Sequence, residues 1–301
     1  MARALTWSFA ASALWLWLAC TSETDSPKPT RFVVLGHVRE LPTDVFGLLA
    51  ERINSLQPDY VFILGDLTNL ATEPQRQRVQ RELFDRLDAP YYAVPGNHDL
   101  MAGADVHEAW IGYRYKLLPD SNASFVLFDS NDDPMTLQRE VESLLDLAEP
   151  RKPIILLGHH PVWKRHLRFI SGRRIRKHHT EAMWKAVENR VDFAFAGDAA
   201  RRFDVELRGR TALYSTGIFF SGRCLPVYFS LGVLDADGHL QVQPVYLDLP
   251  TEHPWHTRRL TELPTERHQY ARQSPGPGAL EPATAVCEGR GASIRAARPP
   301  D

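Results

Sequence analysis

Tyr91-Tyr-Ala-Val-Pro-Gly-Asn-His-Asp99 is the stretch on which the interpretation of this 301-residue chain depends. Its apolar beginning predicts a short strand, and Pro95-Gly96 predicts the end of that strand. An amide, an imidazole and a carboxylate then follow in succession. A strand that ends in this way aims polar side chains into a cleft at the carboxyl edge of a sheet.

Two other apolar runs end in the same manner, Val61-Phe-Ile-Leu-Gly-Asp66 and Ile154-Ile-Leu-Leu-Gly-His-His160. Each places a glycine and then a metal-binding or acid–base residue after a strand. The carboxyl ends of parallel strands meet at one edge, so the three runs predict a single site.

The segments between these runs predict the α/β class. A strand is expected at Arg31–Leu35, a helix beginning at Thr43 or Asp44, and a second helix beginning at Glu73-Pro74. This β-α-β-α-β order implies a parallel sheet with right-handed crossovers. Later elements are expected as helices over 136–148 and 181–189 and as strands over 122–129, 154–158, 191–196, 203–207, 211–216, 227–234 and 240–246, with late neighbours pairing antiparallel.

The composition indicates which partners to expect and which part of the chain folds. The net charge of −2 carries no overall signal for nucleic acid. We expect a single domain over 31–248, preceded by a linker over 21–30. Residues 249–301 are rich in proline and lack apolar periodicity, which predicts a largely disordered tail.

The N-terminus predicts an exported protein. Arg3 precedes the apolar run Ala4–Ala19, which is shorter than the ~20 residues of a spanning helix. The run ends at Cys20 and resembles a bacterial lipoprotein signal, so residues 1–20 are interpreted as a signal peptide with a lipid on Cys20. That would anchor the protein to the membrane of a bacterial cell envelope. Cleaved soluble export to the periplasm or medium and an uncleaved anchor are the alternatives.

The three strand ends together resemble the calcineurin-like metallophosphoesterases, a superfamily that includes purple acid phosphatases and cyclic-nucleotide phosphodiesterases. The resemblance rests on Gly65-Asp66, Gly96-Asn97-His98-Asp99 and Gly158-His159-His160-Pro161, in this order. It covers residues 31–248. It implies a four-layer α/β/β/α fold, a β-sandwich flanked by helices, and a site for two metal ions.

The resemblance also implies roles for individual residues. Asp66 corresponds to the carboxylate that bridges both ions, and Asn97 and His159 correspond to ligands of the second ion. His98 corresponds to the imidazole that is not a ligand but protonates the leaving alkoxide or steadies the phosphoryl oxygens. Asp99 is expected to orient His98 by accepting the proton of its other ring nitrogen.

Two of the family's metal motifs are degenerate in this chain. His37-Val38-Arg39 replaces Asp-x-His, and Gly197-Asp198-Ala199-Ala200 replaces Gly-His-x-His. The first ion is therefore expected to be absent, because His37, Arg39 and Ala200 stand at its positions and an arginine cannot ligate. The second ion keeps four ligands, so one divalent ion (Mn, Fe, Zn or Mg) is expected on Asp66, Asn97, His159 and Asp198.

Basic residues are expected to bind an anionic, phosphorylated small molecule or envelope ligand. The guanidinium of Arg39 could contact phosphate oxygens in place of the missing ion. The segment from Lys164 to Lys177 has seven basic and no acidic residues, and its Arg165, Arg168 and Arg173 are candidate substrate contacts. The alternative for this segment is a solvated loop.

Three functions follow from these observations. The first is an exported hydrolase of phosphate mono- or diesters that uses one metal ion, with Arg39 and His98 in catalytic roles. The second is an inactive pseudo-phosphoesterase that binds an anionic or phosphorylated ligand at the cell envelope. The third is an interaction protein in which an Arg39–Asp198 ion pair fills the former site.

Overall fold

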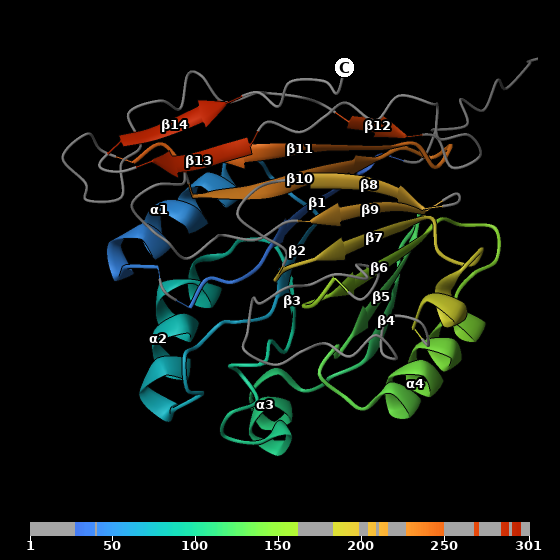
Figure 1. Ribbon diagram of the computed structural model, residues 1–301, viewed down its shortest axis with the longest axis horizontal. Helices are drawn as coiled ribbons and strands as arrows, with labels where there is room; N and C mark the ends of the chain where they lie inside the picture. Colours follow the sequence, from blue (N-terminus) through green and yellow to red (C-terminus); the bar gives the residue numbers. More distant parts are fainter. Residues whose placement is uncertain are drawn as a thin grey trace, which may run out of the picture.

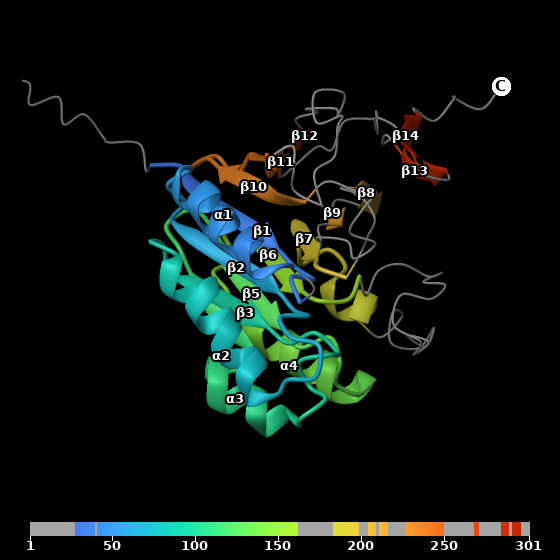
Figure 2. The same cartoon turned by 90° about the vertical axis from the view of Figure 1, so that its left-hand side faces the viewer.

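The computed structural model describes residues 28–39, 41–161, 183–198, 204–208, 211–215, 227–249, 268–270, 284–288 and 291–295. Two six-stranded sheets form its centre (Figures 1 and 2). The first has the order β12-β11-β10-β1-β2-β3, in which β1, β2 and β3 are parallel. Its strands are β1 (Thr30–Leu35), β2 (Tyr60–Leu64), β3 (Tyr91–Val94), β10 (Tyr228–Leu234), β11 (Leu240–Tyr246) and β12 (His268–Tyr270).

The second sheet has the order β4-β5-β6-β7-β9-β8, with β5, β6, β7 and β9 parallel and an antiparallel strand at each edge. Its strands are β4 (Lys116–Pro119), β5 (Ser124–Phe128), β6 (Ile154–Gly158), β7 (Phe193–Ala196), β8 (Asp204–Arg208) and β9 (Thr211–Ser215). The predicted parallel crossovers are confirmed. The expected antiparallel pairing of late neighbours is confirmed for β8 with β9 and for β10 with β11. Strand β9 also pairs with β7, in parallel, because β8 takes the sheet edge.

Helices cover both outer faces (Figure 1). The first sheet packs against α1 (Thr43–Asn54), α2 (Glu73–Glu82), the 3-10 helix η1 (Phe84–Arg86) and α3 (Ala104–Ile111), and the second packs against α4 (Pro134–Leu147) and the helical residues 183–187.

Alternation along β1 explains the layering. Val33 and Leu35 face the helices, whereas Phe32 and Val34 face the second sheet. Aromatic residues of both sheets fill the space between them; for example, the ring centroids of Phe32 and Phe125 lie 5.3 Å apart. The four-layer α/β/β/α fold is thus confirmed.

Several elements differ from the prediction. The cap position of α1 is Pro42, not Thr43 or Asp44, and no side chain caps this helix. Helix α3 and strand β4 were not predicted, since α3 buries only His107 and shows no apolar stripe.

Three described strands lie within residues 249–301, the segment for which a largely disordered tail is expected. Strand β12 pairs with β11, and β13 (Thr284–Glu288) pairs with β14 (Gly291–Arg295). A two-residue connection that begins with glycine joins the last two strands, which is typical of hairpins. None of the helices in the described residues is long and apolar enough to cross a bilayer.

Candidate metal centre

Glycines bring the strand ends of the two sheets into direct backbone contact. A Cβ atom on Gly197, after β7, would lie 2.1 Å from the carbonyl oxygen of Leu64 in β2. A Cβ on Gly65 would lie 2.4 Å from the backbone nitrogen of Gly96, after β3. Only glycine permits these approaches. The side chains that follow the strands are therefore drawn into one cluster.

We expect Gly197→Ala to destabilise the protein by about 1–3 kcal/mol or more, because the added methyl group overlaps backbone that cannot rotate away. Urea unfolding measures this change. Gly47→Ala in α1 is the matched control, because its Cβ would meet only the movable tip of Arg86 and helix propensity favours alanine by up to about 1 kcal/mol. Equal stabilities of the two variants would contradict this explanation.

Asp66 lies on a turn whose backbone is held in an uncommon conformation. Its φ angle is 54°, and the φ angle of His37 in the neighbouring loop is 59°. Two hydrogen bonds join the turn and the loop, from the backbone nitrogen of His37 to Gly65 O at 2.8 Å and from that of Arg39 to Asp66 O at 2.8 Å. Left-handed backbone at non-glycine residues clusters at functional sites.

The two oxygens of Asp66 serve different partners. Oδ2 lies 3.2 Å from Nδ1 of His37 and 3.2 Å from Nε of Arg39, the latter as an ion pair. Oδ1 accepts a hydrogen bond from the backbone nitrogen of His98 at 3.2 Å and lies 3.5 Å from Nε2 of His159. The carboxylate thus faces the guanidinium of Arg39 on one side and the backbone nitrogen of His98 and the ring of His159 on the other.

Two buried ligand atoms at the strand ends lack hydrogen-bond partners in the described part of the chain. They are Oδ1 of Asn97 and Nε2 of His159. Nδ1 of His159 lies 2.8 Å from Leu64 O, a carbonyl that can only accept, so Nδ1 carries the proton. Buried polar atoms are usually satisfied, and orphaned ones call for an explanation such as an ion.

Asp198 and His160 complete this side. The backbone nitrogen of Asp198 donates to His159 O at 2.7 Å, which ties the end of β7 to that of β6. Nε2 of His160 lies 3.9 Å from Oδ2 of Asp198, and His160 is only 5% exposed. Oδ1 of Asp198 also lies 3.6 Å from Nδ1 of His37.

Burial and mutual charge shift the pKa values of the cluster. Burial lowers the pKa of His37 to about 4, so this imidazole is neutral at pH 7. Burial raises the pKa of Asp198 to about 6. Burial is the largest single influence on Asp66 and His159 and opposes their charged forms, but the surrounding charges together outweigh it. The pKa of Asp66 is therefore lowered, mainly by His159, His37 and Arg39, and that of His159 is raised, mainly by Asp66 and Asp198.

Asn69 organises the catalytic candidates and was not predicted. Its backbone oxygen lies 2.8 Å from Nδ1 of His98, and its Oδ1 accepts from Nη1 of Arg39 at 2.9 Å. Nη1 of Arg39 is also 3.1 Å from Nδ1 of His98. The two neighbours of Nδ1 make opposite demands, because the carbonyl of Asn69 can only accept and the guanidinium of Arg39 can only donate. The shorter contact is to Asn69 O, so we assign the proton to Nδ1 of His98, which leaves Nε2 for chemistry.

The family model for the calcineurin-like phosphoesterases matches residues 43–201, more than half of the chain. This chain belongs to that family. Calcineurin-like phosphoesterases are divalent-metal-dependent hydrolases of phosphate esters. A search of curated proteins found no match.

Solved structures show the same fold. A purple acid phosphatase from yellow lupin (Lupinus luteus) seeds has a TM-score of 0.54 and 15% identity over 73% of this chain. This chain covers only 53% of the lupin protein, about half its length. A dimetal phosphatase from Danio rerio has a TM-score of 0.54 and 11% identity, over 72% of this chain and 98% of that one.

The residues on the Oδ1 side of Asp66 fit a divalent ion of the kind that calcineurin-like phosphoesterases use. Nε2 of His159, which has no hydrogen-bond partner among the described residues, lies 3.5 Å from Oδ1 of Asp66, and Nδ1 of His159 is anchored as is typical of metal-binding histidines. The Oδ2 side carries Arg39, whose permanent charge disfavours a cation.

The expected role of Asp99 is wrong. Its carboxylate does not accept from the ring of His98; instead it accepts from the backbone nitrogens of Leu67, Thr68 and Gly96 at 2.9–3.1 Å and from the hydroxyl of Thr68 at 3.1 Å. The carboxylate turns toward the backbone because these donors are buried and have no other acceptor near. Burial and the charge of Asp66 nevertheless raise the pKa of Asp99 to about 6.

Asp99→Ala should therefore cost stability before it affects chemistry. Three buried N–H groups would lose their acceptor at about 1–3 kcal/mol each, for a total of at least about 3 kcal/mol. Urea unfolding tests this value against Asp133→Ala, which removes the exposed cap of α4 at a cost of about 0.5–2 kcal/mol. If Asp99→Ala lowers the free energy of unfolding by no more than Asp133→Ala does, Asp99 is not the acceptor on which these buried N–H groups depend.

The other sequence-based candidates divide into two groups. Contacts join six of the candidates into one network, His37, Arg39, Asp66, His98, His159 and Asp198, and Asn97 directly precedes His98 in the chain. Arg39 forms an ion pair with Asp66. Ala200, Arg165, Arg168, Arg173 and Cys20 lie outside the described residues.

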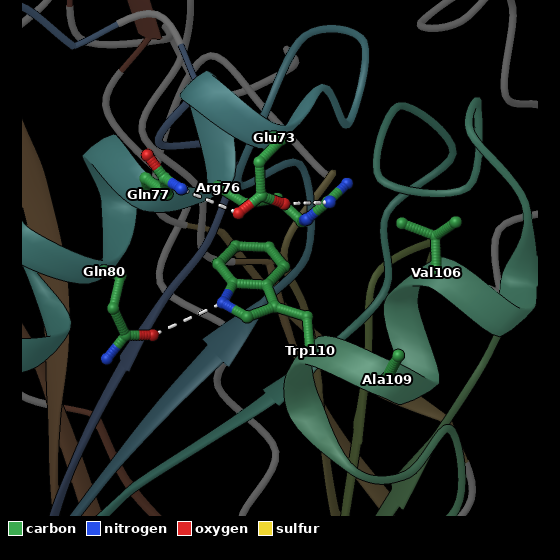
Figure 3. Close-up of a pocket in the computed structure, with 7 residues that line it drawn as sticks. All are labelled: Glu73, Arg76, Gln77, Gln80, Val106, Ala109 and Trp110. Carbon is green, nitrogen blue, oxygen red and sulfur yellow. Dashed lines mark hydrogen bonds and ion pairs between the residues drawn. The ribbon is translucent and has the colours of Figure 1, made fainter.

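A pocket between α2 and α3 is separate from this cluster (Figure 3). Trp110 forms one wall, and its indole nitrogen donates to Oε1 of Gln80 at 3.3 Å. Glu73 accepts from Gln77 and Arg76, so the polar groups of the pocket satisfy one another. None of the strand-end residues lines it. The candidate site of this phosphoesterase is therefore the strand-end cluster.

Proposed function

We propose that the protein hydrolyses phosphate mono- or diesters with a single divalent ion bound to Asp66, Asn97, His159 and Asp198. The supporting observation is that the two carboxylate oxygens of Asp66 face different partners. Oδ1 lies 3.5 Å from Nε2 of His159, an atom with no hydrogen-bond partner among the described residues, whereas Oδ2 is paired with Arg39. One side is suited to a cation and the other already contains one.

When bound, such an ion supplies a Lewis acid and lowers the pKa of coordinated water. Arg39 supplies the second positive charge. Its guanidinium is held by Asp66 and Asn69, and its planar fork suits the oxygens of a phosphoryl group. Arg39 would bind and orient the ester and stabilise the negative charge of the transition state.

His98 delivers the proton to the leaving alkoxide. The transfer requires the imidazolium form, in which each ring nitrogen carries a proton. The proton on Nδ1 stays on the hydrogen bond to Asn69 O, and the one on Nε2 is transferred, which leaves a neutral imidazole. Because the backbone nitrogen of His98 also donates to Asp66 Oδ1, the acid is held beside the metal-binding carboxylate.

Steady-state hydrolysis of a phosphomonoester and a phosphodiester, with metal-free protein and with added Mn²⁺, tests the proposal. We expect turnover only with metal. Metal binding and competitive phosphate binding without turnover on either ester would contradict it and favour the pseudo-phosphoesterase. Absence of both kinds of binding would favour the interaction protein.

Arg39→Gln should lower kcat/KM by roughly 10–100-fold, because it removes a charged hydrogen bond to the substrate and such bonds contribute about 1.5–3 kcal/mol. Metal affinity should be unchanged or higher, because a cation beside Asp66 is removed. Kinetics together with metal titration measure both effects. If Arg39→Gln loses metal instead of activity, Arg39 acts in folding the site and not on the substrate.

We further propose that the protein is exported and anchored by a lipid on Cys20, with Arg165, Arg168 and Arg173 gathering an anionic substrate. The arginine-led apolar run ending at Cys20 and the run of basic residues support this proposal. Mass spectrometry of the mature protein should show a lipidated N-terminal Cys20, and Cys20→Ser should release the protein from membranes. An unmodified Cys20 in the mature protein would overturn the anchor.

A further inference from the structure

His160 lies at the end of β6, directly after the metal-ligand candidate His159. It is only 5% exposed, and its ring centroid lies 4.6 Å from that of His159 at an interplanar angle of 72°. Successive side chains of a strand point to opposite faces, but the chain leaves β6 at Gly158 and both rings enter the same cluster. His160 is therefore part of the site.

Ser130 holds the ring of His160 in place. Its Oγ lies 2.9 Å from Nδ1 of His160 and accepts from the backbone nitrogen of the same residue at 3.0 Å. With Nδ1 engaged, the remaining ring nitrogen, Nε2, is the one that lies 3.9 Å from Oδ2 of Asp198. An imidazole fixed through one nitrogen so that the other faces a cluster of donors is typical of metal-binding histidines.

The loop that carries Ser130 is itself rigidly held. Asp129 is fully buried, and its Oδ2 accepts from Nε of Arg114 at 2.7 Å. Asn131 donates from Nδ2 to Pro95 O at 3.1 Å, which joins the loop to the turn that carries Asn97. The position of His160 is thus set by the surrounding fold.

Three of the five proposed donor atoms lie close to one another. One ligand atom from each of His159, His160 and Asp198 lies within 4.8 Å of the others. An ion with bonds of about 2.0–2.2 Å holds its ligand atoms roughly 3–3.6 Å apart, so the groups need to close by about 1 Å. The orphaned Nε2 of the fully buried His159 is the independent sign that a ligand belongs here.

We propose that His160 is a fifth protein ligand of the ion, so that two imidazoles bind it together with three oxygen ligands. This inference rests on the proposed function with a single ion, and it adds which class of metal ion the site prefers. Two nitrogen ligands favour Zn²⁺, Fe²⁺ or Co²⁺ over Mg²⁺, which prefers an all-oxygen environment. Ser130 is the positioning residue for the second imidazole.

The test compares wild type, His160→Ala and Ser130→Ala with His239→Ala. Zn²⁺ affinity is measured by competition with a chromogenic chelator, and pulsed EPR of the Cu²⁺-loaded proteins counts the coordinated imidazoles. His239→Ala is the matched control, because it removes an exposed imidazole beside Asp235 and Asp237 and so also removes a weak surface site.

We expect two imidazoles in wild type and one in His160→Ala, with Zn²⁺ affinity lower by at least about tenfold. Ser130→Ala should lose about 10–100-fold, and Mg²⁺ affinity should change less than Zn²⁺ affinity. Thermal unfolding shows whether each variant is folded. If His160→Ala does not fold, Ser130→Ala still tests whether His160 is a ligand.

One imidazole in wild type, with unchanged Zn²⁺ affinity in the folded His160→Ala and Ser130→Ala variants, would overturn the role of His160. The proposed function would survive that result. No Zn²⁺, Mn²⁺ or Cu²⁺ binding by wild type would overturn both.

Discussion

Asp66→Asn is expected to lower metal affinity by at least about 100-fold and to abolish metal-dependent ester hydrolysis. Loss of a group that merely orients a ligand costs about 10–100-fold, and Asp66 is placed as a ligand itself. Asparagine is the sharpest substitution here. It tolerates the left-handed backbone of this position, and its amide oxygen can still accept from the backbone nitrogen of His98.

Titration of Asp66→Asn with Mn²⁺ and Zn²⁺, followed by calorimetry, measures the effect. Thermal unfolding establishes that the variant is folded. Asp237→Asn is the control, because it removes the charge of an exposed carboxylate in the turn after β10. If Asp66→Asn binds metal as tightly as Asp237→Asn, the ion is not bound at Asp66 and the assigned ligand set is wrong.

His98→Gln is expected to lower kcat by about 10²–10⁴-fold while metal content and fold remain as in wild type, because the imidazole transfers a proton and is not a ligand. Glutamine can still donate a hydrogen bond but cannot act as an acid. The backbone nitrogen that donates to Asp66 is unchanged.

Kinetic constants and bound metal are measured on the same preparation, with His239→Ala as the imidazole control on an exposed turn. An ester with a good leaving group should lose less activity in His98→Gln than one with a poor leaving group, since it needs less protonation. Equal losses for both esters would show that His98 does not protonate the leaving group.

Much of the site could be predicted because its residues follow strands directly. Asp66, Asn97 and His159 are each placed by a strand end and a glycine, both of which are readable in the sequence. Partners across the fold could not be predicted in this way. Ser130 meets His160 from 30 residues away, and only the packing of the loop after β5 determines that contact.

The role of Asp99 shows a second limit. A carboxylate next to a histidine in sequence suggested a hydrogen-bonded pair. In the fold this carboxylate instead accepts from the buried backbone nitrogens of Leu67, Thr68 and Gly96, because burying N–H groups without an acceptor is costly. Asn69 was missed for a related reason, because its backbone oxygen, which has no sequence signature, is what positions His98.

Helix α3 and the hairpin of β13 and β14 are elements of the fold that the sequence did not predict. Helix α3 spans Ala104–Ile111 and buries one histidine, so no apolar period shows it. The hairpin lies among prolines, whose density favoured an irregular tail over two strands of five residues each.

The number of ions bound at saturation tests the central claim most directly. Wild type and His239→Ala are loaded with Mn²⁺, freed of weakly bound metal, and analysed for metal per chain. One tightly bound ion per chain in both proteins is the predicted result, because Arg39 pairs with Asp66 on the side where a first ion would bind. Two tightly bound ions per chain would contradict the single-ion site.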